Sequence, residues 1–226
     1  SVLKSSSIQA MHLDVFNLIL PKLSGRAIRV DTNNPTYGWA DMLGLVHIKS
    51  PGANDPTLAV YRGNLRQFQF SNNATNEAFM EFHVPHDYLL VSDIHIHTHW
   101  SQIVVDTGGA AGVPGTVTWS FDVTYSKGHG QAAFPAPVTT FVTQQAATVQ
   151  YQHNLVEVQL SASSPSASQI DTDSLEPDGI ILVRAYRDPT DAADTLNQAP
   201  FLHYVDIHYQ TSGILGTKQK APDFYV

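Results

Sequence analysis

The chain has 226 residues, of which 42% are hydrophobic and 14% are charged, against roughly 25% charged residues in typical soluble domains. This composition excludes a disordered chain, and the low charge indicates that partners cover part of the surface. The net charge of −8 without a basic stripe argues against nucleic-acid binding, and the absence of cysteine excludes disulfides, thiolate zinc sites and cysteine nucleophiles.

The first predicted element is a helix over residues 8–20, which Pro21 would end. Serines at positions 5–7 offer N-caps, and apolar residues recur at helical spacing: Ile8, Met11, Val15, Leu18 and Ile19. Two packing arrangements for the apolar face of this helix agree equally well with the sequence. It packs on the chain's own domain, or it forms an arm on a neighbouring subunit.

From residue 24 onward the pattern is that of β-strands. Short runs rich in Val, Ile, Thr, Tyr and Phe alternate with Gly, Pro, Asn and Asp clusters. The predicted strands are 27–30, 43–49, 58–61, 67–70, 77–84, 93–102, 117–125, 139–142, 149–160, 179–187 and 201–210. Many strands without a second helical pattern predict an all-β fold, a β-sandwich of the jelly-roll kind.

Three parts of the chain are expected. Residues 1–25 form an N-terminal helix or arm, residues 26–212 form the β-sandwich domain, and residues 213–226 form an extended C-terminal tail without periodicity. No run approaches the ~18 apolar residues of a membrane span, and no signal peptide is recognisable, so no membrane partner is expected.

Histidines alternate in the segment DIHIHTHW, residues 93–100. On a strand, His95, His97 and His99 share one face with Asp93, and the apolar residues between them form the opposite, core-facing side. The histidine face therefore meets solvent, a partner or a metal ion. Histidines two apart on a strand are ~6.6 Å apart at Cα and can converge on one ion, whereas His95 and His99 are ~13 Å apart.

Three interpretations of this row stay open. In the first, the histidines hydrogen-bond across the sheet or line an interface. In the second, two neighbouring histidines of His95, His97 and His99 supply ligands to a metal site within one chain. A third ligand then comes from another strand: Glu81, Glu157, His203, Asp206 or His208. In the third, a symmetric trimer places one pair per subunit around its axis.

Other motifs give no support for catalysis. Hydrolase, zinc-protease, P-loop and dinucleotide-binding fingerprints are missing, so no catalytic residues and no cofactor are expected. The acidic run DPTDAAD, residues 188–194, reads as a capped turn. Trp39, Trp100 and Trp119 are expected in the core or as interface anchors, although stacking on sugars is an alternative.

Four segments, in this order, resemble a family of tailed-bacteriophage virion structural proteins. They are FHVPHDYLLVSDIHIHTHW (82–100), GTVTWSFDVTYSKG (115–128), GIILVRAYRDPTDAADT (179–195) and FLHYVDIHYQTSGILGTKQKAP (201–222), and the similarity spans about residues 60–222. The resemblance implies a jelly-roll protein of the virion that assembles as a homotrimer. It also implies a non-enzymatic role, as a decoration or cement protein bound to the major capsid protein or to other virion proteins.

Three other functions compete with head decoration. A neck or tail component and a glycan-binding β-sandwich at a receptor-binding tip share the fold class. A cupin-like metalloenzyme using His95 and His97 is the third rival. A cupin usually carries a Glu shortly after this pair, and residues 99–102 (HWSQ) contain none.

Overall fold

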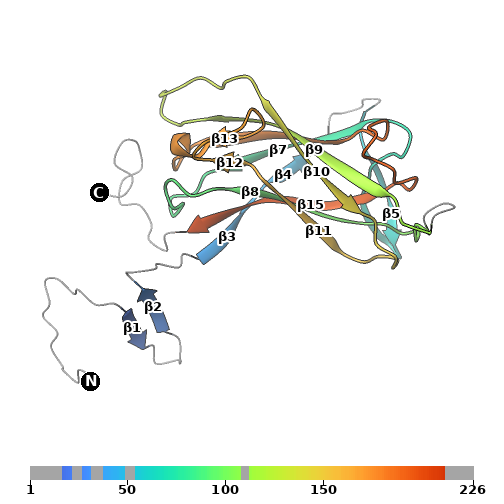
Figure 1. Ribbon diagram of the computed structural model, residues 1–226, viewed down its shortest axis with the longest axis horizontal. Helices are drawn as coiled ribbons and strands as arrows, with labels where there is room; N and C mark the ends of the chain where they lie inside the picture. The colour runs from blue at the N-terminus through green and yellow to red at the C-terminus, as the bar shows by residue number, and fades with distance from the viewer. Residues whose placement is uncertain (1–16, 22–26, 32–37, 49–53, 108–111, 212–226) are drawn as a thin grey trace, which may run out of the picture. The chain divides into compact units, whose positions relative to one another are not determined.

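The computed structural model describes residues 17–21, 27–31, 38–48, 54–107 and 112–211 (Figure 1). The chain divides into two units, Ser1–Gly38 and Trp39–Val226. Among the described residues no helix is long and apolar enough to cross a membrane. The predicted tail, residues 213–226, lies outside the described residues.

The first unit contains an antiparallel pair of strands, β1 (Asn17–Pro21) and β2 (Ala27–Asp31). The predicted helix over residues 8–20 is therefore wrong for its last four residues, which belong to β1, and residues 8–16 lie outside the described part. Pairing with β2 supplies backbone hydrogen bonds from outside the segment, and this competes with the local helical periodicity.

The second unit is a β-sandwich of two antiparallel sheets, which confirms the predicted jelly-roll class. The first sheet has the order β10-β9-β14-β7-β4. Its strands are β4 (Leu45–His47), β7 (Asn76–His83), β9 (Thr116–Ser126), β10 (Val138–Gln145) and β14 (Ile180–Arg187).

The second sheet has the order β11-β8-β15-β6-β5, and β3 also pairs with β15. Its strands are β3 (Gly38–Leu43), β5 (Thr57–Arg62), β6 (Leu65–Gln69), β8 (His95–Ser101), β11 (Asn154–Gln159) and β15 (Phe201–Thr211). A short parallel pair, β12 (Ser161–Ala162) with β13 (Ile170–Asp171), precedes a single 3-10 turn, Thr172–Ser174.

Two predicted strands differ from the observed ones. The predicted strand 43–49 is two strands in different sheets, and the chain changes sheet at Gly44, which packs so closely on the Phe82 ring that a Cβ would overlap it. The predicted strand 149–160 begins only at Asn154, because the chain turns before it and Tyr151 has φ of +58°.

The core lies between the two sheets and is rich in aromatic side chains. Trp100 of β8 and Trp119 of β9 are completely buried with ring centroids 6.5 Å apart, and Phe70 meets Trp119 edge-on at 5.1 Å. Trp39 on β3 is different, because 48% of its surface is exposed. Two of the three tryptophans thus serve the core, and only Trp39 is available to a ligand.

Candidate metal centre on the outer face of the second sheet

Strand β8 carries the histidine row, and its side chains alternate as its sequence predicts. Ile96, Thr98 and Trp100 are completely buried on the core side. His95, His97 and His99 point to the outer face, where their side chains are 21%, 10% and 19% exposed. The outer face is therefore a largely covered polar surface.

The neighbouring strands bring carboxylates to this row. Strands β11 and β15 flank β8, and the antiparallel registers place Glu157 and Asp206 directly opposite His97 on its two sides. The same register places His208 opposite His95. A histidine with a carboxylate on each side results from the pairing of three strands that are far apart in the sequence.

Glu157 holds two of the histidines. Its Oε2 lies 2.6 Å from Nε2 of His97, and its Oε1 lies 3.4 Å from Nδ1 of His95. Burial by itself raises the pKa of Glu157, but the hydrogen bond from His97 and the charges of His95, His97 and His208 outweigh it and lower that pKa on balance.

Asp206 lies on the other side of the row and is more deeply buried. Its side chain is 5% exposed, with Oδ1 3.3 Å from Nε2 of His99 and 4.0 Å from Nδ1 of His97. Burial raises the pKa of Asp206, against the attraction of His99, and burial lowers the pKa of His99, against the attraction of Asp206.

Two further histidines border the row. His153 stacks on His99 with ring centroids 5.0 Å apart, and its Nε2 lies 2.8 Å from Nδ1 of His99. His203 lies at a register shift in β15, between Leu202 and Tyr204, and its Nε2 is 2.7 Å from Oγ of Ser101. Burial lowers the pKa of His203, and the charges of His153 and His99 lower it further.

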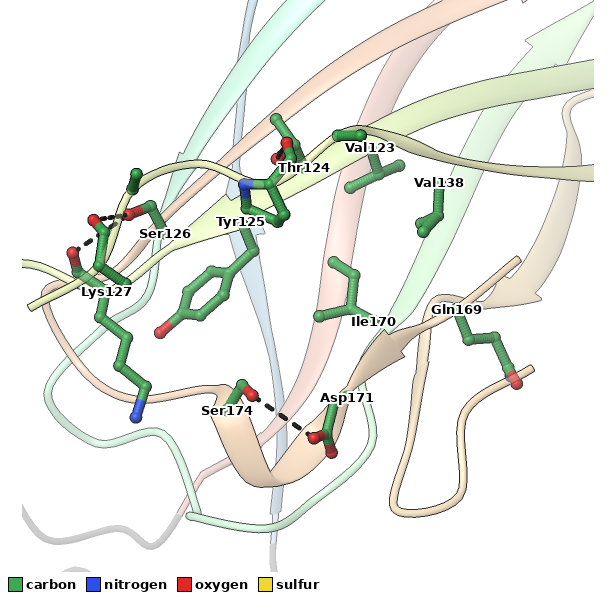
Figure 2. Close-up of a pocket in the computed structure, with 14 residues that line it drawn as sticks. Val123, Thr124, Tyr125, Ser126, Lys127, Val138, Gln169, Ile170, Asp171 and Ser174 are labelled. Atoms are coloured by element: carbon green, nitrogen blue, oxygen red, sulfur yellow. Dashed lines mark hydrogen bonds between the residues drawn. The ribbon is translucent and has the colours of Figure 1, made fainter. Parts of the chain in front are cut away.

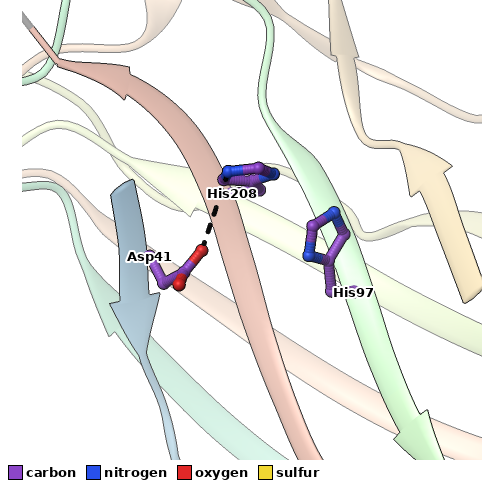
Figure 3. Close-up of side chains that lie close together, drawn as sticks. All are labelled: Asp41, His97 and His208. Atoms are coloured by element: carbon purple, nitrogen blue, oxygen red, sulfur yellow. Dashed lines mark ion pairs between the residues drawn. The ribbon is translucent and has the colours of Figure 1, made fainter. Parts of the chain in front are cut away.

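Two groups of side chains on this face have ligand atoms within 4.8 Å of one another. One is His97, His99 and Asp206, and the other is Asp41, His97 and His208. Figure 3 shows the second group, drawn from β3, β8 and β15, with the Asp41–His208 ion pair at 3.9 Å.

Of the predicted ligands His95, His97 and His99, the structure brings His97 and His99 into these groups and leaves His95 beside Glu157. Asp206 and His208 were among the expected third ligands, whereas Glu81 lies on β7 in the first sheet. Sequence reasoning missed Asp41 and His153. No local signal marks either residue, because their position depends on the pairing of β3 and on the turn before β11.

His95, His97 and His99 lie on the outer face of the second sheet and not in the space between the two sheets. Between the two sheets the corresponding space is filled by apolar side chains, Ile94 and Ile96 among them. A metal ion held by His97 would lie outside the sandwich.

A separate pocket of about 350 Å³ opens at one end of the sandwich (Figure 2). Its polar groups already have structural partners: Lys127 pairs with Glu176 at 3.5 Å, and Asp171 accepts a hydrogen bond from the backbone of Asp173. Burial raises the pKa of Tyr125 to about 12, so this phenol stays protonated near neutral pH. This set of groups does not resemble a catalytic site.

The acidic run at residues 188–194 is also structural. Asp188 accepts hydrogen bonds from the backbone N–H of Thr190 at 2.9 Å and from its hydroxyl at 2.7 Å, as in a capped turn. Asp194 is buried against Arg187.

Comparison with known proteins gives only distant structural similarity. No family model and no curated protein matches the chain. Solved structures with a similar arrangement of strands include a CBM61 module, TmCBM61, in complex with β-1,4-galactotriose, with 10% identity, a TM-score of 0.30 and coverage of 77% of this chain and 88% of that one. A CBM35 module from Cellvibrio japonicus Abf62 has 10% identity and a TM-score of 0.33 over 75% of this chain and 98% of that one. A family 22 module of Clostridium thermocellum Xyn10B has 14% identity and a TM-score of 0.29 over 78% and 87%. Similarities at this level carry no information on function.

Proposed function

We propose that this chain is a non-enzymatic structural protein of a tailed-phage virion, which acts by protein–protein contact. In this proposal it forms a homotrimer and decorates the head by binding the major capsid protein. The four segments in residues 82–222 that resemble such proteins support the assignment to a virion.

The observation that carries a contact function is the apolar hairpin of β5 and β6. Strand β5 ends the second sheet, and Leu58 and Val60 on it are 51% and 50% exposed. Leu65 on β6 is 67% exposed. An edge strand with exposed apolar side chains pairs readily with another chain unless something covers it. A partner subunit or a capsid protein would provide that cover.

The proposal is tested by measuring mass in solution and binding to particles. Light scattering of the full chain should give a trimer, and the chain should co-sediment with heads of the phage that encodes it. Replacing Leu58 and Val60 by lysine should weaken one of these contacts, because lysine on an edge strand opposes pairing.

Val149→Lys is the matched control, since Val149 is 57% exposed in a turn outside the hairpin. This variant should behave as the unmodified chain. The proposal would be contradicted if the full chain is a monomer that does not bind phage heads. It would also be contradicted if the double lysine variant assembles and binds normally.

One specific observation favours a glycan-binding component as the second candidate. Trp39 is half exposed on the second sheet, and its ring packs against His208 at 4.7 Å and His95 at 5.8 Å. An exposed indole beside polar side chains suits stacking on a sugar ring. A glycan array that responds to the full chain and loses its signal with Trp39→Ala would favour this candidate over the first. Trp119 is completely buried and cannot contribute.

A further inference from the structure

The outer face of the second sheet contains a buried carboxylate whose charge is incompletely compensated. Oδ1 of Asp206 is shielded from solvent and has no hydrogen-bond partner among the described residues. Burying such a group without a partner is costly, and native proteins rarely leave it so. Two imidazole nitrogens face this oxygen, Nε2 of His99 at 3.3 Å and Nδ1 of His97 at 4.0 Å.

The hydrogen bond to Glu157 determines which nitrogen of His97 is free. An ionised carboxylate only accepts, so the 2.6 Å contact between the two side chains requires Nε2 of His97 to donate. In the neutral imidazole, Nδ1 then carries a lone pair, and Nδ1 is the nitrogen of His97 that lies near Asp206. Nδ1 of His97 and Oδ1 of Asp206 are 4.0 Å apart with no hydrogen between them, so both atoms can bind the same cation.

We propose that Nδ1 of His97, Nε2 of His99 and a carboxylate oxygen of Asp206 bind one divalent transition-metal ion of the zinc type. The ligand atoms of these residues already lie within 4.8 Å of one another. A tetrahedral zinc ion with bonds of about 2.0–2.2 Å separates its ligands by about 3.4 Å, so small side-chain rotations complete the site. Three protein ligands leave a fourth position for water or for a group from a partner.

The outer contacts of the ligands match those of known metal sites. A metal-bound histidine usually donates its second ring nitrogen to a carboxylate or another acceptor, which fixes the ring and its tautomer. His97 has Glu157 in this position, and His99 has Nε2 of His153 at 2.8 Å from its Nδ1. Both histidine ligands are therefore already held in orientation by a contact of the ring nitrogen that does not bind the ion.

The alternative group around Asp41 is less suited to hold the ion. The Asp41 side chain is 50% exposed, and its oxygen is 3.9 Å from His208. Water already satisfies an exposed carboxylate, so it gains less from a cation than the buried Asp206 does. Because all ligands of the proposed site come from one chain, the site does not depend on the trimer or on the virion role.

The test is zinc titration of the full-length, chelator-treated chain by calorimetry, with the absorption of bound Co²⁺ as a second readout of coordination. One ion should bind per chain. Asp206→Asn should weaken the zinc affinity by more than about tenfold, and Glu157→Gln should weaken it by about tenfold or more. Asp41→Asn, the same substitution in the other group, should leave it within about twofold.

Circular dichroism and thermal unfolding of the metal-free variants show whether each variant is correctly folded. Metal-free Asp206→Asn should unfold at a temperature no lower than the unmodified chain, since the change removes a poorly compensated buried charge. The proposal is overturned if the unmodified chain binds no zinc, or if one ion binds per three chains. It is equally overturned if Asp41→Asn abolishes binding while Asp206→Asn does not.

Discussion

A buried ion pair at the end of β14 joins Arg187 to Asp194, and removing one partner of such a pair leaves the other charge buried without compensation. The guanidinium of Arg187 is inaccessible to solvent and bonds both carboxylate oxygens of Asp194, at 2.7 and 2.8 Å. It also donates to the backbone carbonyl groups of Ser71, Leu196 and Gln198. Arg187 thus ties the loop after β14 to the loop between β6 and β7.

Asp194→Asn should therefore be severely destabilising. The substitution keeps the shape of the side chain but leaves the Arg187 charge buried without its counterion, a change that costs about 3–5 kcal/mol. For a domain of this size each kcal/mol lowers the unfolding temperature by about 2–4 °C. The expected loss is therefore about 6–20 °C in thermal unfolding, with a matching shift of the urea midpoint.

Asp191→Asn is the matched control in the same turn. Asp191 is exposed and accepts a hydrogen bond from the backbone N–H of Ala193 at 2.8 Å, which asparagine can also accept. It should change stability little. The reasoning is refuted if Asp194→Asn costs under about 1 kcal/mol, or if the two variants lose stability equally.

Two further predictions concern the loops at the ends of the sheets. Asp178 contacts three histidines at 3.0–3.2 Å: His83, His86 and His129. Burial by itself raises the pKa of Asp178, but these contacts outweigh it and lower the pKa from 3.8. A carboxyl group with a lowered pKa stabilises the fold above its unfolded pKa, and this contribution fades as the pH falls through the folded value. Asp178→Asn should thus reduce stability at pH 6, and urea unfolding should show that the difference shrinks below about pH 3.8; a difference that persists unchanged in acid would contradict this. Asparagine also tolerates the φ of +63° at this position, so the substitution isolates the charge. Gly115→Ala should lower the urea midpoint, because a Cβ there would lie 2.5–2.9 Å from the backbone of Thr195 and Leu196; an unchanged midpoint would show that this backbone can move.

Much of the strand content follows from local patterns. Strands β5, β7, β8, β9, β14 and β15 lie within one to three residues of the predicted ranges, because alternating side chains and flanking turn residues act over short distances. The N-terminal segment shows the limit of this approach. Its helical spacing is real, but the last four residues pair with β2.

The candidate site divides in the same way. The alternation in DIHIHTHW determines that His95, His97 and His99 share the face opposite Ile96 and Trp100. It does not determine that Glu157 and Asp206 flank His97, because these two residues are 60 and 109 positions away from His97 in the chain. The sequence alone does not distinguish among several acidic residues and histidines as the third ligand of a metal site.

The sequence by itself thus determined the fold class, the side of each strand that faces the core and the chemical character of the histidine face. Only the tertiary structure decided which strands are neighbours, in which register they pair and which carboxylate is buried beside which imidazole. The physical reason is the range of the forces involved. Alternation depends on backbone geometry between adjacent residues, whereas strand pairing depends on the packing of the whole core between the two sheets.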